Sequence, residues 1–282
     1  MTENLFLVSG ILCCMSQFVL VTGGTSGIGR ITAQELKQRG FQVAIVGRNP
    51  SEAARELGVE GFAADFSSLA SVRALAQAVR AKHDQIDVLV NNAGAIYTKR
   101  QLSQDGNELT LAVNHLAPFL LTNELAPVLK PGARVVNVAS EASRGMTLDF
   151  TDLQSARRYF SFRAYGRTKL MNILFTQELA KRLPGVSVNA MHPGFVASNF
   201  GAGGWIASAV KLVKLFARTP AQGADTAVWL ASDPSLQGVS GKYFMDRREK
   251  RPTRGARDLA AQERLWAESE RLVSATAGRA AA

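Results

Sequence analysis

A tyrosine and a lysine four residues apart, Tyr165 and Lys169, are the residues of this chain whose types and spacing most directly suggest chemistry. On a helix, residues four apart lie on one face, so the lysine ammonium can approach the phenol. A free tyrosine has a pKa near ~10 and is a poor base at neutral pH. A neighbouring cation favours the phenolate and lowers that pKa, so the spacing predicts a proton-transferring tyrosine assisted by a lysine. Ordinary pairing on a helix surface gives the same spacing, so other motifs must decide between the two interpretations.

A glycine-rich turn near the N-terminus predicts a site for a dinucleotide. The apolar run 18–22 is typical of a buried strand, Gly23, Gly27 and Gly29 follow it, and residues 30–39 have a helical pattern. Glycines let the backbone approach phosphates, and the first N–H groups of a helix attract them. The spacing is G-x-x-x-G-x-G rather than the common G-x-G-x-x-G, and a glycine-rich loop without a ligand is the alternative.

Three further motifs follow the glycine turn along the chain. They are Asn91-Asn92-Ala93-Gly94, the polar set Asn114, Ser140, Tyr165 and Lys169, and the segment 192–198 with the sequence His-Pro-Gly-Phe-Val-Ala-Ser. In type and order, these motifs resemble those of the short-chain dehydrogenase/reductase family, over residues 15 to 273. Residues 170–183, 241–244 and 265–270 are most similar to the retinol-dehydrogenase-like branch of that family.

The resemblance implies an oxidoreductase with a catalytic tetrad of Asn114, Ser140, Tyr165 and Lys169. Tyr165 would exchange a proton with the substrate oxygen, Ser140 would hold that oxygen, and Lys169 would lower the Tyr165 pKa and bind the nicotinamide ribose. Asn114 would place a water in a proton relay to Lys169. A strand-end turn residue and a buried amide satisfied by backbone are the alternative interpretations of Ser140 and Asn114. The residues expected to bind the cofactor are Gly23, Thr25, Ser26, Gly27, Ile28, Gly29, Arg48, Asp65, Phe66, Asn92, Ala93, Gly94, Tyr165, Lys169, Pro193, Gly194, Val196 and Ser198.

The end of the second expected strand indicates which cofactor binds. An acidic residue there would bind the ribose 2′-hydroxyl of NAD, but this chain has Gly47 followed by Arg48. A guanidinium binds a 2′-phosphate with two parallel hydrogen bonds, so we expect NADP(H). The alternative is that Arg48 is an ordinary surface residue and both cofactors bind. Asp65 resembles the aspartate that contacts adenine in this family, and a cap before Ser67 is its alternative role.

Strands and helices are expected to alternate along the chain. Besides 18–22, strands are expected at 41–46, 61–64, 86–90, 135–138, 186–190 and 242–245, and helices at 30–39, 69–82 and 165–182. In the helix at 69–82, one apolar stripe is expected, formed by Val72, Leu75, Ala76 and Val79. This alternation predicts an α/β fold, a Rossmann-type doubly wound three-layer sandwich around a parallel sheet of about seven strands. Ligands bind at the carboxyl ends of such strands.

The composition indicates one catalytic domain, residues 15–282, with no proline- or serine-rich linker in a chain of 282 residues that is 46% hydrophobic. We expect residues 1–14 to be a disordered extension or the product of an upstream start, with a signal anchor as the alternative. The two cysteines, Cys13 and Cys14, are adjacent and the three histidines are scattered, so no metal site is expected.

The net charge of +10 invites a nucleic-acid interpretation. The densest basic run, residues 247–254, has no interleaved aromatic residue and matches no nucleic-acid-binding module. A solvated basic surface that attracts the anionic cofactor is therefore expected instead.

The expected substrate is a hydrophobic aldehyde, ketone or alcohol. Residues 145–162 are expected to form a loop made basic by Arg157, Arg158 and Arg163, and residues 201–218 an apolar lid. The alternative for the second segment is a basic amphipathic helix that rests on a membrane. Relatives often assemble as homodimers or homotetramers, and a cytoplasmic location is expected. A non-catalytic NADP(H)-sensing protein is the alternative function, and the complete tetrad favours the enzyme.

Overall fold

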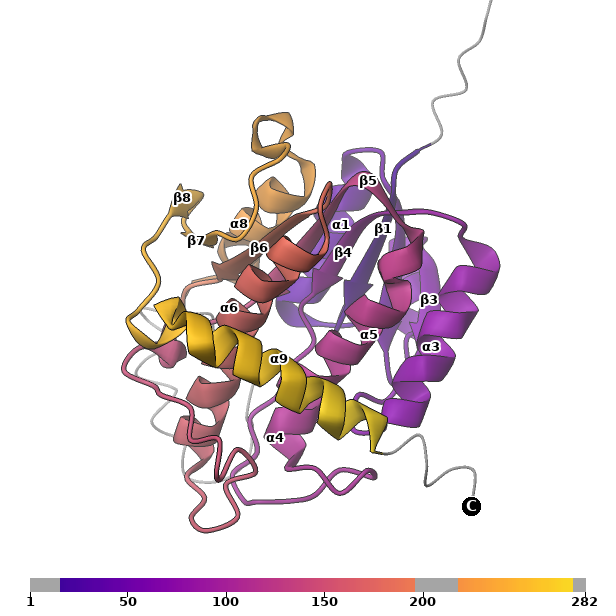
Figure 1. Ribbon diagram of the computed structural model, residues 1–282. Helices are drawn as coiled ribbons and strands as arrows, with labels where there is room; N and C mark the ends of the chain where they lie inside the picture. Colours follow the sequence, from indigo (N-terminus) through magenta and orange to yellow (C-terminus); the bar gives the residue numbers. More distant parts are fainter. Residues whose placement is uncertain (1–15, 196–217, 276–282) are drawn as a thin grey trace, which may run out of the picture.

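The computed structural model describes residues 16–195 and 218–275, and its centre is one twisted sheet (Figure 1). In the described part of the chain the sheet has eight strands in the order β3-β2-β1-β4-β5-β6-β7-β8. The strands are β1 Phe18–Thr22, β2 Gln42–Gly47, β3 Glu60–Ala63, β4 Ile86–Asn91, β5 Leu129–Val138, β6 Ser187–His192, β7 Tyr243–Met245 and β8 Arg248–Glu249. The first seven pair in parallel, and β8 pairs antiparallel with β7.

Helices cover both faces of this sheet, which confirms the doubly wound three-layer fold. One layer holds α1 (Gly27–Gln38), α2 (Ser51–Leu57) and α8 (Pro220–Ser232), and its side chains share one buried cluster with one face of the sheet. The other layer holds α3 (Leu69–Lys82), α5 (Ala117–Leu125), α6 (Ser161–Arg182) and the one-turn α4 (Leu109–Leu111). The C-terminal helix α9 (Leu259–Ser274) crosses the outer side of α5 and α6 (Figure 1).

The apolar patterns of the sequence correspond to the two buried clusters. Every residue of β1 is buried, as the continuous apolar run predicts for a central parallel strand. On α3 the expected stripe is confirmed, because Val72, Leu75, Ala76 and Val79 are all buried. The α3 helix begins where Ser68 caps it, accepting a hydrogen bond from the Ser71 N–H.

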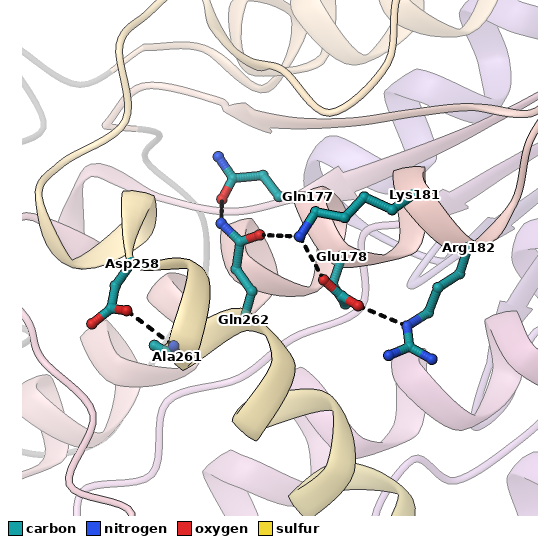
Figure 2. A network of polar contacts seen from close by, with 7 residues as sticks. All are labelled: Gln177, Glu178, Lys181, Arg182, Asp258, Ala261 and Gln262. Carbon is teal, nitrogen blue, oxygen red and sulfur yellow. Dashed lines mark hydrogen bonds and ion pairs between the residues drawn. The ribbon is translucent and has the colours of Figure 1, made fainter.

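A polar network fastens α9 to the C-terminal half of α6 (Figure 2). Gln262 of α9 accepts a hydrogen bond from Lys181 (2.9 Å) and donates one to Gln177 (2.8 Å). Glu178, also on α6, accepts from both Lys181 and Arg182 at 2.8 Å. Helix α6 also carries Tyr165 and Lys169 in its N-terminal half, so this network holds the other half of the same helix in place.

The structure differs from the sequence-based expectations in a few places. Strand β5 begins at Leu129 rather than at 135, and the hairpin strand β8 was not expected. Helix α6 begins at Ser161, one turn before the expected start. The expected N-terminal extension at 1–14 and nearly all of the expected lid at 201–218 lie outside the described residues. Within the described ranges, no helix has the length and apolar character needed to cross a membrane, and no cluster of potential metal ligands was found.

Candidate active site

The predicted motifs meet at the carboxyl edge of the sheet, where four neighbouring strands end. The glycine turn follows β1, the Asn92-Ala93-Gly94 segment follows β4, Ser140 follows β5, and Pro193 follows β6. These strands are adjacent in the order β1-β4-β5-β6, so their ends lie side by side. The fold therefore collects segments that are far apart in the sequence at one edge.

The glycine turn has the geometry of a phosphate cradle. Gly23 and Gly27 have φ angles of +67° and +54°, which side chains disfavour. A Cβ on Gly29 would lie 2.3 Å from the carbonyl oxygen of Gly23, so no side chain fits at that position. Ser26, which precedes α1, makes no side-chain cap, and this leaves the first N–H groups of the helix facing the turn. These features fit a dinucleotide pyrophosphate.

Two side chains join the glycine turn to the segment that follows β4. The fully buried Thr22 hydroxyl accepts hydrogen bonds from the N–H groups of Asn92 and Ala93, both at 3.0 Å, and donates to the Val90 carbonyl. The Asn92 amide donates to the Thr22 carbonyl at 2.8 Å and to the Gly23 carbonyl at 3.3 Å. These hydrogen bonds of Asn92 hold the start of the glycine turn in place, which gives a physical reason for an asparagine at this position.

Asn114 lies on a π-helical turn, Ala112–Leu116, and is completely buried. Its Oδ1 accepts from the Ala95 N–H at 2.7 Å, and its Nδ2 donates to the Ala95 carbonyl at 2.9 Å and to Thr168 at 3.1 Å. A Cβ on Gly94 would lie 3.3 Å from this Oδ1 and 3.5 Å from the Lys169 ammonium nitrogen. The side chain of Asn114 thus holds the segment after β4 next to Lys169, and its role in a water relay stays a prediction.

Tyr165, Lys169 and Ser140 come together as the resemblance implies. Ser140 and the half-buried Tyr165 share a side-chain hydrogen bond. The Lys169 ammonium nitrogen lies 5.5 Å from the centre of the Tyr165 ring and donates to the carbonyl of Val138 at 3.0 Å. The tetrad is therefore assembled from the end of β5, the N-terminal half of α6 and the π-helical turn.

The pKa of Tyr165 is raised in this structure, where a lowered pKa was expected, and a lowering contribution from Lys169 stays a prediction. Burial raises the pKa of Tyr165 to about 12, and the hydrogen bond with Ser140 opposes that rise only in part. Burial also lowers the pKa of Lys169 from 10.5 to about 8. The ammonium is nearly inaccessible and donates to a backbone carbonyl, and desolvation of each group disfavours its charged form. At neutral pH the site therefore holds a protonated phenol beside a protonated lysine.

Gly166 is a functional residue that the sequence analysis missed. A Cβ at this position would lie 2.5 Å from the carbonyl oxygen of Ala142, which belongs to the turn that begins at Ser140. Only a glycine therefore lets this turn approach α6 closely enough for Ser140 to reach Tyr165. Glycine inside a helix costs about 1 kcal/mol relative to alanine. A glycine next to Tyr165 in an expected helix is therefore the feature of the sequence that could have pointed to Gly166.

The end of β2 lies against the glycine turn. A Cβ on Gly47 would be 2.5 Å from the methyl group of Thr25, so glycine is required for this contact. Arg48 follows with an exposed side chain. The pKa of Tyr97 is raised, mainly by burial, while the charge of Arg48 lowers it and the charge of Asp65 raises it. Both charged side chains therefore lie near the Tyr97 phenol. An exposed guanidinium beside the cradle fits the 2′-phosphate of NADP(H).

The other residues expected to bind the cofactor differ in their surroundings, and two of them are not described by the structure. Asp65 accepts a hydrogen bond from the Ser67 N–H at 2.9 Å, so its carboxylate also has the capping role that was the alternative. Phe66 is buried. Gly194 has a φ of +80° and packs closely against the side chain of Arg218, while Val196 and Ser198 lie outside the described residues.

The fold and this site define a short-chain dehydrogenase. The family model described as short chain dehydrogenase matches residues 17–203, and the chain belongs to this family. It is therefore an oxidoreductase that acts on alcohol or carbonyl groups.

Named relatives and solved structures support this assignment. The chain is 40% identical to human retinol dehydrogenase 14, over 90% of this chain and 85% of that protein. A protein structure from Mycobacterium paratuberculosis has a TM-score of 0.77 and 32% identity over 92% of this chain and 93% of that one. A short chain dehydrogenase from Burkholderia cenocepacia in complex with NADP has a TM-score of 0.65 and 26% identity over 81% of this chain and 95% of its own. The match to retinol dehydrogenase 14 places the chain near the retinol-dehydrogenase-like members.

Proposed function

We propose that this protein interconverts a hydrophobic alcohol and its aldehyde or ketone with NADP(H), and that Tyr165 is the general acid and base. The observation that carries the proposal is the hydrogen-bonded pair of Tyr165 and Ser140, held beside Lys169 at the sheet edge where the phosphate cradle lies. A non-catalytic protein has no need of a proton donor, a second hydroxyl and a buried ammonium in one place.

The protonation of Tyr165 supports a role as proton donor in carbonyl reduction. With a pKa raised to about 12, the phenol holds its proton at neutral pH. The Ser140 hydroxyl can donate a hydrogen bond to the same substrate oxygen and stabilise the negative charge that develops there. Bound NADPH would supply the hydride to the carbonyl carbon, and the reverse reaction would require Tyr165 to accept the proton.

Lys169 would hold the nicotinamide ribose and provide positive charge beneath the phenol. Its ammonium lies beside Gly94, in the segment next to the phosphate cradle. When Tyr165 gives up its proton, this cation, which donates to the Val138 carbonyl, would stabilise the resulting phenolate. Asn114 keeps the adjacent segment in place through its three hydrogen bonds.

The preference for NADP(H) over NAD(H) rests on Gly47 and Arg48. At the end of β2 no carboxylate is present to repel a 2′-phosphate, and Arg48 presents an exposed guanidinium there. The NADP complex of the related Burkholderia dehydrogenase is consistent with this preference.

Three exposed phenylalanines support a hydrophobic substrate. Phe162 is 63% exposed and lies one helical turn before Tyr165 on α6, while Phe160 and Phe195 are 49% and 60% exposed. Large exposed apolar side chains near a site favour an apolar ligand. The relative human retinol dehydrogenase 14 is named for a hydrophobic alcohol. The cytoplasmic location and the homodimer or homotetramer stay predictions, which cell fractionation and light scattering would test.

The test is the oxidation of NADPH, followed by absorbance, with a panel of hydrophobic aldehydes and ketones. We expect turnover with at least one carbonyl, and slower turnover with NADH at the same concentration. Tight NADPH binding without turnover in either direction would favour the alternative, a cofactor-sensing protein. Equal kcat/KM for NADPH and NADH would contradict the role of Arg48.

A further inference from the structure

Glu141 directly follows Ser140 and makes two hydrogen bonds that connect the turn to the neighbouring strands. Its backbone N–H donates to Nδ1 of His192, the last residue of β6, at 3.3 Å. Its carboxylate accepts from the hydroxyl of Tyr243, the first residue of β7, at 3.1 Å. Both partners are buried, with 8% and 4% exposure. Neither contact involves a residue of the tetrad.

The hydrogen bonds inside the turn fix its shape but not its place on the sheet. Ser140 caps the short 3₁₀ helix Glu141–Ser143, and its hydroxyl accepts from the Ala142 N–H at 3.1 Å. The Ser143 N–H donates to the Ser140 carbonyl at 3.0 Å. The turn is pressed against α6 at Gly166 on one side. Just before the turn, the Ala139 N–H donates to the Met191 carbonyl of β6 at 2.8 Å, and the two bonds of Glu141 add a link to the end of β6 and one to β7.

The protonation states required for both bonds are present at neutral pH. Burial lowers the pKa of His192, so the imidazole is neutral and its Nδ1 accepts the hydrogen bond from the Glu141 N–H. Among the charged neighbours of His192, Glu141 and Asp246 raise this pKa, while Arg218 and Lys169 lower it. Burial, and then the charge of Glu141, raise the pKa of Tyr243, which keeps its hydroxyl proton for donation. The Arg144 guanidinium is 3.9 Å from the other carboxylate oxygen and is largely exposed, so it contributes little.

We propose that Glu141 is a positioning residue for Ser140: it ties the serine turn to the ends of β6 and β7, so that the Ser140 hydroxyl stays in contact with Tyr165. This inference rests on the proposed function for its effect on turnover. Its structural content, an anchored turn, is independent of catalysis. The tethers come from β6 and β7, the two strands that follow β5 in the sheet, whereas the hydroxyl of Ser140 contacts Tyr165 on α6.

The test measures four variants: Glu141→Ala, Tyr243→Phe, the double variant that carries both changes, and Glu141→Gln alone. A control, Glu249→Ala, removes a carboxylate that pairs with Lys242 beside β7 and makes no contact with the turn. We expect each of the first two changes to lower kcat roughly tenfold, because a misplaced catalytic group loses rate steeply with distance. The double variant should be no slower than either single variant, since both changes remove the same bond. Glu141→Gln keeps an acceptor oxygen and should retain kcat within about twofold of the wild type. The Kd for NADPH should not change in any variant.

A second readout, hydrogen exchange followed by mass spectrometry over residues 139–146, does not depend on activity. We expect Glu141→Ala and Tyr243→Phe to speed exchange in this segment at least about tenfold, while Glu249→Ala leaves it unchanged. Wild-type kcat and exchange in both variants would overturn the inference and leave the proposed function intact. Faster exchange with full kcat would also overturn it. If the wild type reduces no carbonyl, the proposed function fails. In that case, wild-type hydrogen exchange over residues 139–146 in Glu141→Ala and Tyr243→Phe would separately reject the anchored turn.

Discussion

Gly166→Ala offers a sharp test of how the site is assembled. The new Cβ would lie 2.5 Å from the carbonyl oxygen of Ala142. Carbon–oxygen contacts are usually no shorter than about 3.3 Å, so the serine turn and α6 must separate by about 0.8 Å. A displacement near 1 Å at a catalytic group can reduce the rate about 100-fold. We therefore expect kcat to fall roughly 10- to 100-fold.

The effect on stability should be much smaller than the effect on rate. Alanine is favoured over glycine inside a helix by about 0.5–1 kcal/mol, and this offsets part of an overpacking cost of about 1–3 kcal/mol. The free energy of unfolding, measured with urea, should thus decrease by at most about 2.5 kcal/mol. NADPH binding should not change, because Gly166 does not contact the glycine turn.

The assay for Gly166→Ala is steady-state carbonyl reduction in two backgrounds, wild type and Ser140→Ala. If the substitution acts by moving Ser140, it should add little to the loss already caused by Ser140→Ala. Full activity of Gly166→Ala would refute the reasoning about close approach. Equal losses in both backgrounds would show that the turn does not act through Ser140.

Three further outcomes are expected. Lys169→Met should lose activity yet be more stable than the wild type at pH 7 by on the order of 1–3 kcal/mol, because burial holds the pKa of Lys169 at about 8, below its ordinary 10.5. Between these two pKa values the unfolded wild type binds more protons than the folded wild type, so its free energy of unfolding should rise from pH 8 to pH 10.5. The difference in stability between Lys169→Met and the wild type should therefore shrink over this range. A larger difference in urea titrations at pH 10 than at pH 7 would contradict this. Arg48→Ser should raise KM for NADPH about tenfold and leave KM for NADH nearly unchanged, and an equal rise for both cofactors would argue against a 2′-phosphate contact. Thr22→Val should lower the free energy of unfolding by about 2–4 kcal/mol, because it leaves the N–H groups of Asn92 and Ala93 without the acceptor they share, and a loss below about 0.5 kcal/mol in urea would show that they find another.

Much of the fold could be predicted because the apolar patterns are clear. The continuous apolar run of β1 and the stripe of α3 correspond to buried surfaces, and the motifs lie where the strands end. The two-residue β8 could not be predicted, because its pairing depends on a hairpin in which Asp246 and Arg247 adopt positive φ angles. Positive φ angles are uncommon for residues other than glycine, and two in succession are not evident from this sequence.

The site was predicted in its residue types but not in its electrostatics. Spacing indicates that Lys169 shares a helix face with Tyr165, yet it does not show that the ammonium is buried and bonded to the Val138 carbonyl. Burial is a tertiary property, and it reverses the expected direction of the Tyr165 pKa. The contacts of Gly166 and Glu141 were missed for the same reason, since each depends on a segment that is distant in the sequence.

The measurement that tests the central claim most directly is the comparison of wild type with Tyr165→Phe. The variant keeps the ring and loses only the hydroxyl, so NADPH should bind with a Kd within about threefold of the wild type. Because positioned proton transfer contributes about 10²- to 10⁴-fold, turnover of the best carbonyl should fall by at least about 100-fold. A variant that binds NADPH normally and keeps more than about a tenth of the wild-type kcat would contradict the assignment of Tyr165 as the general acid.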